Sequence, residues 1–297
     1  MFGILAASWL ALYQFLGVNS GFATSFSLLQ QLWDLYGNPA ADLEYAKLIP
    51  LAIIMLLWHK RDRLAAAGPG PRWPGVFLMG LALLAHLAGF SSQQSTLSTL
   101  ALFAGIYSLM GIVWGAGVMR EAFFPFFLLF FCVPLGSIMD DGTFKLRLLA
   151  TRLTFFVSHT VLGVPLAIDG TTLTTPGGRA FEVIAACSGL RSFTALLVVT
   201  IIYAMTGLTR LWKRVFIVGV TVPLAIGCNV LRLSAMVVAH RAFGPRAGKF
   251  VHDTDWIITY GVAIAVIMVL GHLLREKDTP PQEENPATGE VIESCSA

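Results

Sequence analysis

Three side chains from separate parts of the chain have the chemistry of a nucleophilic site. Cys187 lies in the run ACSGLR at 186–191, at the mouth of a long apolar segment. Arg232 stands inside a second apolar segment, and His252 comes just before a third. A thiol, a guanidinium and an imidazole can together attack a carbonyl group, stabilise the resulting negative charge and move a proton. The sequence therefore predicts a cysteine-nucleophile site, provided that the three segments meet.

The surroundings of Cys187 favour its ionised form. A free thiol with a pKa of about 8.5 is only slightly ionised at neutral pH, and the thiolate is the reactive species. Arg191 is four residues further on, which places it on the same face of a helix. If that helix begins near Ser188 and Gly189, its N-terminal dipole also favours the thiolate. The alternative is a small buried apolar cysteine, as the aromatic surroundings of Cys132 suggest for that residue.

The setting of Arg232 is costly unless the side chain has a use. An arginine at the centre of a membrane span costs about 2.5–3.5 kcal/mol on insertion scales. Arg232 lies toward one end of its segment, so a side chain that reaches the membrane surface is the alternative. Asn229, one turn earlier, is also polar. An arginine that only reaches the membrane surface does not require a polar neighbour inside the span, so Asn229 favours a functional role for Arg232. Cys228 lies close to both residues and is interpreted as a buried apolar side chain.

Only two of the six histidines, His240 and His252, share a membrane face with Cys187 and Arg232. Asp253 follows His252 directly, and its carboxylate could fix the tautomer of the imidazole. A solvated loop histidine is the alternative for His252. A zinc site formed by Cys187, His240 and His252 is conceivable, but Arg191 and Arg232 would repel the cation. We therefore expect neither a metal nor a cofactor.

The composition places these residues in a membrane protein. The chain is 56% hydrophobic and 12% charged, whereas a soluble chain has about 25% charged residues. The net charge of +3 is small, no nucleic-acid-binding pattern occurs, and the four cysteines lack the spacing of a disulfide framework. We expect an all-α polytopic domain over residues 1–274 and a disordered cytoplasmic tail at 275–297, which contains Cys295.

Eight apolar blocks are long enough to be candidate spans. The first lacks a basic leader and a cleavage site, and is expected to be a retained span rather than a signal peptide. The blocks cover residues 3–18, 43–58, 74–90, 97–116, 122–138, 188–207, 213–239 and 256–274.

The distribution of Lys and Arg orients the spans. The segments 59–73, 117–121 and 208–214 carry basic residues, whereas 19–42 and 91–96 carry none. Basic loops stay in the cytoplasm, so the N-terminus is predicted to be inside. Cys187, Arg232 and His252 then lie at the outer face.

Two longer outside regions are predicted, at 139–187 and 240–255. In the first, Lys145, Arg152 and His159 recur every seven residues along 143–162, which suits a helix lying in the membrane interface. A β-hairpin follows, with strands at 171–175 and 180–184, and leads directly into Cys187.

With these features together, the chain resembles the exosortase/archaeosortase family of membrane-embedded cysteine enzymes. Residues 186–192 resemble the family's cysteine motif, 229–232 its Asn-x-x-Arg motif and 252–253 its His motif. The pattern extends from about Tyr45 to Arg275. The chain departs from it at 254–256, where the family often has a glycine, and at Glu182, where an acidic residue is displaced from its usual place before the cysteine motif.

The resemblance implies a protease or transpeptidase of the bacterial inner membrane whose site faces the periplasm. Its substrates would be exported proteins with a C-terminal sorting signal, of the PEP-CTERM type: a short motif, one membrane span and a basic end. Cys187 would attack the carbonyl group, Arg232 would stabilise the oxyanion and His252 would shuttle the proton, with a glycan or lipid as a further acceptor of the acyl group. Two alternatives stay open: another membrane acyltransferase, and a non-enzymatic scaffold or transporter for exported polysaccharide.

The orientation can be tested with single cysteines. In intact cells, a membrane-impermeant thiol reagent should label cysteines introduced at 171–175 and should not label those at 208–212. The opposite pattern would reverse the orientation and move the site to the cytoplasm.

Overall fold

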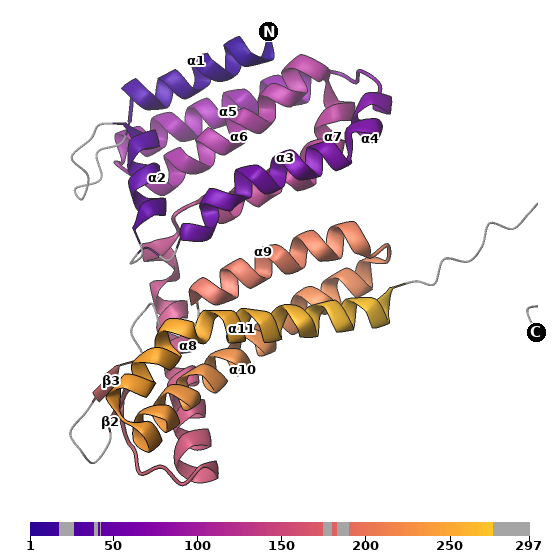
Figure 1. The fold of residues 1–297 in the computed structure, drawn as a ribbon. Helices are drawn as coiled ribbons and strands as arrows, with labels where there is room; N and C mark the ends of the chain where they lie inside the picture. The colour runs from indigo at the N-terminus through magenta and orange to yellow at the C-terminus, as the bar shows by residue number, and fades with distance from the viewer. Residues whose placement is uncertain (18–26, 39–40, 42, 175–179, 183–189, 276–297) are drawn as a thin grey trace, which may run out of the picture.

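The computed structural model describes residues 1–17, 27–38, 41, 43–174, 180–182 and 190–275 (Figure 1). Two groups of helices run in a common direction, and each of the eight predicted spans overlaps a helix in one of them. The overlap is partial for 122–138, because the α-helix there ends at Phe127 and residues 133–135 are not helical. The first group is formed by α1 (Phe2–Phe15), α3 (Ile49–His59), α5 (Trp73–Ser91), α6 (Ser95–Trp114) and α7 (Ala116–Phe127). The second is formed by α9 (Leu190–Gly207), α10 (Leu211–Phe243) and α11 (Pro245–Leu274).

Segments expected on opposite sides of the membrane lie at opposite ends of the helices (Figure 1). The short helix α4 (Arg61–Ala66) and the α9–α10 connection, both basic, lie at one end. The helix α2 (Leu28–Gly37), the long helix α8 (Gly136–Phe155) and the β-sheet lie at the other. We call these the inner and outer ends. The chain is therefore a multi-pass membrane protein in which the expected inner and outer segments are separated in space.

Three helices in the described part, α5, α6 and α10, are each long and apolar enough to cross a membrane. Two further predicted spans are broken rather than continuous. The 3₁₀ helix η2 (Glu44–Leu48) precedes α3, and the 3₁₀ helix η3 (Leu128–Cys132) continues α7 after Pro125. A 3₁₀ helix rises about 2.0 Å per residue against about 1.5 Å for an α-helix, so each composite segment is nearly as long as a bilayer core is thick.

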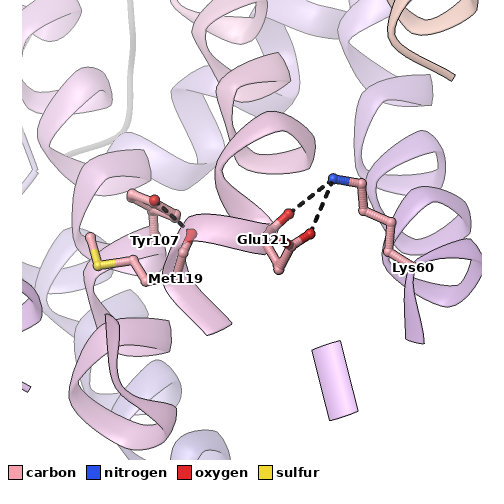
Figure 2. A network of polar contacts seen from close by, with 4 residues as sticks. All are labelled: Lys60, Tyr107, Met119 and Glu121. Atoms are coloured by element: carbon pink, nitrogen blue, oxygen red, sulfur yellow. Dashed lines mark hydrogen bonds and ion pairs between the residues drawn. The ribbon is translucent and has the colours of Figure 1, made fainter. Parts of the chain in front are cut away.

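Polar contacts join α3, α6 and α7 at the inner end (Figure 2). Lys60 Nζ donates a hydrogen bond of 3.2 Å to the carbonyl oxygen of Glu121 and lies 3.9 Å from its carboxylate. Tyr107 donates a 2.8 Å hydrogen bond to the carbonyl oxygen of Met119. These bonds satisfy carbonyl groups of α7 and fix its inner half in the first group.

Three side-chain hydroxyl groups hold the outer end of the α7–η3 segment. Tyr36 donates to the carbonyl oxygen of Cys132 at 2.7 Å, and Tyr45 donates to that of Phe131 at 3.0 Å. Thr96 donates to the carbonyl oxygen of Pro134 at 2.7 Å. At this corner the chain leaves the first group and enters α8.

The predicted interfacial helix is confirmed as a helix and is longer than expected. It begins at Gly136 rather than 143 and continues from Phe155 into a π-helical turn, η4 (Phe156–Val161). The sequence Asp-Asp-Gly at 140–142 also lies inside α8. The helix runs across the direction of the two helix groups at their outer end (Figure 1), as expected for a helix along a membrane surface.

The predicted hairpin is confirmed and has a third strand. Strands β2 (Thr172–Thr174) and β3 (Ala180–Glu182) pair antiparallel, with Leu173 opposite Phe181. Strand β1 (Ala167–Asp169), which was not expected, pairs with β2 through a tight turn in which Gly170 has a φ of +58°. Glycine adopts this left-handed conformation without strain, which explains the Asp-Gly sequence there. The expected strand ends at 175 and at 183–184 lie outside the described residues.

The prediction of an outer loop over 240–255 is wrong. Helix α10 continues to Phe243 and α11 begins at Pro245, so the connection is Gly244 alone. Its φ of +85° reverses the chain, and Pro245 suits the first turn of the next helix. His240 and His252 are therefore helical residues. The predicted tail beyond Arg275 lies outside the described residues.

Candidate functional site

Helices α9, α10 and α11 pack together as an antiparallel trio, and their shared core fixes how they are aligned. Ala225 and Cys228 of α10 are buried in one cluster with Leu196 of α9 and Ala263 of α11. Gly271 of α11 lies where an added Cβ would overlap the ring of Tyr203 in α9, so these helices approach closely near the inner end. The alignment along the axes can therefore be worked out from helix lengths.

The first turn of α9 lies level with the Asn-x-x-Arg motif. Helix α9 has 18 residues and is about 25 Å long at a rise of about 1.5 Å per residue. The same length along α10, measured from Leu211, ends near Cys228. Cys187 is three residues before Leu190, the first residue of α9. Cys187, Ser188 and Gly189 themselves lie outside the described residues, as does the side chain of Arg191.

Asn229 is the most unusual described side chain near this level. It is only 3% exposed, and neither its amide oxygen nor its amide nitrogen has a hydrogen-bond partner among the described residues. A buried polar group without a hydrogen bond costs about 1–3 kcal/mol. The Nε atom of Arg232, one turn further on, is also enclosed by the protein. Leu231, which comes between them in the sequence, is apolar and exposed and lies on the opposite side of the helix. Asn229 and Arg232 therefore face the protein rather than lipid.

The structure adds a buried hydroxyl face on α8 that the sequence analysis did not single out. Helix α8 and η4 pack against α10, and Thr151, Thr154 and Ser158 are fully buried. Ser234 of α10 is 3% exposed. Among the described residues, the hydroxyl groups of Thr154, Ser158 and Ser234 have no hydrogen-bond partner. Residues 151, 154 and 158 have the spacing of one helix face, and this pattern of small hydroxyl residues could have been found in the sequence.

The sheet is anchored beside the outer part of α10. Val164 and Leu166, just before β1, form a small buried cluster with Val237 of α10, and Phe155 packs against it. Val164 also donates a backbone hydrogen bond of 2.9 Å to the carbonyl oxygen of Ser158. The strand that leads toward Cys187 is thus held near the end of α10 that carries Arg232.

The alignment of α10 with α11 brings His252 nearer than His240 to the level of Arg232. Arg232 lies about 16 Å before the end of α10, and His252 about 10 Å after the start of α11, at about 1.5 Å per residue. His240 lies in the last turn of α10 and is about 12 Å from Arg232 along the axis. The side chains of His252 and Asp253 lie outside the description, so their pairing and the zinc alternative stay untested predictions.

The two described cysteines, Cys132 and Cys228, are buried, as expected for apolar cysteines. They are 2% and 7% exposed, and the thiol of Cys132 lies 3.8 Å from the carbonyl oxygen of Ala46. Cys228 is part of the α9–α11 core. Both thiols are therefore surrounded by the packed interior of the protein.

The model of one protein family, the transmembrane exosortases, matches residues 37–269, more than three quarters of the chain. The matched region contains every predicted site residue, all of α9 and α10 and most of α11. No curated protein and no solved structure gives a significant match. The chain therefore belongs to the transmembrane exosortase family.

The alignment of the helices predicts which histidine acts in the site. Replacing His252 with Ala should slow substrate processing by at least about 100-fold, the low end for general acid–base catalysis. His240→Ala should cost little, because His240 lies further from the level of Arg232. The measurement is the processing rate of each variant at equal abundance in the membrane. A dead His240 variant beside an active His252 variant would show that the wrong histidine was chosen.

Proposed function

We propose that this exosortase is a cysteine enzyme that processes exported proteins carrying a C-terminal sorting signal. The observation that carries the proposal is the position of three elements in the outer parts of neighbouring helices: the first turn of α9, the Asn229–Arg232 turn of α10 and the turn of α11 that contains His252, with the α10 turn between the levels of the other two. Each follows or contains one of the three residues expected from the sequence. Family membership supports the same interpretation. The buried amide of Asn229, which has no hydrogen-bond partner among the described residues, supports it further, because burying such a group costs free energy that a role in the site would justify.

The proposed reaction begins with the Cys187 thiolate. Its sulfur forms a bond to a substrate carbonyl carbon, and the negative charge moves to the carbonyl oxygen. The guanidinium of Arg232 stabilises that oxyanion through charge-assisted hydrogen bonds. The tetrahedral species then breaks the carbon–nitrogen bond, and His252 gives its proton to the departing amine. A thioester on Cys187 remains, and the C-terminal fragment leaves with its membrane span.

The second half of the reaction resolves the thioester. An acceptor amine or hydroxyl group, or water, attacks the thioester carbon while His252 removes its proton. The carbon–sulfur bond breaks and Cys187 returns to the thiolate. An acceptor amine would give a new amide bond and make the enzyme a transpeptidase, a hydroxyl group of a glycan or lipid would give an ester, and water would make it a protease.

The proposed arrangement has eight membrane crossings, with the N-terminus in the cytoplasm and the site at the periplasmic face of a bacterial inner membrane. The composite segments η2–α3 and α7–η3 would cross with the help of their neighbours. The substrates would carry a tripartite signal of the PEP-CTERM type. Their own span would lie in the bilayer beside the second helix group, which holds the scissile bond at the level of the site.

The nucleophile can be tested with matched cysteine variants. Cys187→Ala and Cys187→Ser should both leave uncleaved precursor in the membrane. Cys132→Ala and Cys228→Ala should retain most activity, since both thiols are buried in packing clusters. Precursor and product are measured by immunoblot of membranes with equal enzyme abundance. Normal processing by Cys187→Ala would refute the enzyme, and full function of Cys187→Ser would favour a scaffold.

A further inference from the structure

The outer surface of α8 carries two adjacent stripes that nothing in the proposed reaction uses. Leu146, Leu149, Leu153 and Phe156 are 40%, 43%, 38% and 56% exposed. At about 100° per residue they share one broad face of the helix. The buried hydroxyl side of α8 points toward α10 instead. The helix thus exposes its large apolar side chains and buries its small polar ones.

A basic row borders this apolar stripe. Lys145 and Arg152 are seven residues apart, are both exposed, and lie on one face of the helix next to the apolar stripe. No ion pair to either is found among the side chains that the structure describes. His159 continues the row and is fixed, with its Nδ1 3.2 Å from the carbonyl oxygen of Val164 and its ring stacked on Phe155. Lys145 and Arg152 therefore place two positive charges along the edge of an apolar surface.

The position of α8 in the fold indicates which part of the membrane contacts the apolar stripe and the basic row. The helix lies across the outer ends of the spans (Figure 1), where hydrocarbon gives way to phospholipid headgroups. The apolar stripe is suited to the hydrocarbon and the basic row to the layer of phosphates just above it. Lysine and arginine bind phosphate oxygens by charge-assisted hydrogen bonds.

We propose that α8 docks on anionic phospholipids of the outer leaflet, with Lys145 and Arg152 binding their headgroups and the Leu146–Phe156 stripe buried among the acyl chains. Zwitterionic lipid would bind the stripe without the added attraction. Since α8 packs against α10, the bound lipids would fix the height of Arg232 relative to the membrane surface. Lipid binding itself does not depend on the proposed reaction, so its test uses no substrate.

The test is photocrosslinking of the full-length protein in nanodiscs. A photoreactive p-benzoylphenylalanine replaces Leu153, and the nanodiscs contain equal amounts of phosphatidylglycerol and phosphatidylcholine. After irradiation, mass spectrometry counts adducts of each lipid. We expect phosphatidylglycerol adducts to exceed phosphatidylcholine adducts by about threefold or more, because each basic residue near the surface adds to the attraction for anionic lipid. The excess should shrink at high salt.

Matched variants separate the basic row from general lipid contact. The same photoreactive residue at Leu84, which is 65% exposed on α5, should give nearly equal adducts. The double variant Lys145→Gln and Arg152→Gln should lower the ratio at 153 to that at 84. The charge-conserving variant Lys145→Arg and Arg152→Lys should keep it high, which excludes misfolding as the cause.

Four outcomes would overturn the proposal. One is an equal lipid ratio at position 153, and a second is an excess that survives the double glutamine variant. The third is crosslinking of 153 to protein rather than to lipid, which would mean that a protein covers the stripe. If inorganic phosphate abolishes the excess more strongly than chloride at equal ionic strength, the row is a site for free phosphate and not for lipid.

Discussion

The hydrogen bonds at residues 131–134 turn the chain from the direction of the spans into the plane of the outer surface. Three hydroxyl groups, from Tyr36, Tyr45 and Thr96, satisfy backbone carbonyl oxygens where η3 ends. An irregular turn at the membrane boundary is stable only if its carbonyl groups find such partners, because lipid supplies none. The direction of α8 depends on this corner, and the packing of α10 depends on α8.

The second constraint is the antiparallel alignment of α9, α10 and α11. A short connection at each end, with Gly244 between the last two helices, leaves little freedom to slide. The contact of Gly271 with Tyr203 and the buried alanines of the shared core fix the alignment. Asn229 and Arg232 are held in this rigid setting near the first turn of α9. The proposed role of Arg232 in stabilising an oxyanion would need such support, since a mobile guanidinium would lose most of its effect.

The sequence predicted the helices well because the membrane imposes one simple rule on apolar blocks. Every expected span overlaps a helix, although the one at 122–138 is interrupted at 133–135, and the Lys and Arg distribution agrees with the two ends of the fold. The hairpin was predicted from its turn residues. The outer loop at 240–255 was mispredicted, because the polar residues there suggested a loop while one glycine with positive φ allows both helices to continue through them. Polarity outside the bilayer does not distinguish a loop from an extended helix.

The hydroxyl face of α8 and the burial of Asn229 could not be predicted, since both depend on which side of a helix meets its neighbour. Periodicity identifies faces but does not say which face is inside when lipid and protein are both apolar. The proposed relation of Cys187 to Arg232 is of the same kind. It is inferred from the lengths of α9 and α10 as antiparallel neighbours, and no local sequence pattern predicts it.

The central claim is that Cys187 meets the Asn229–Arg232 turn of α10, and disulfide trapping tests it most directly. In a chain whose other native cysteines are replaced, a new cysteine at 229 or 232 should form a disulfide with Cys187 under mild oxidation. A disulfide requires Cα atoms within about 7 Å. A cysteine at 231, whose native leucine is 58% exposed on the opposite side of α10, serves as the control and should stay reduced. Bond formation at 231, with none at 229 or 232, would contradict the account.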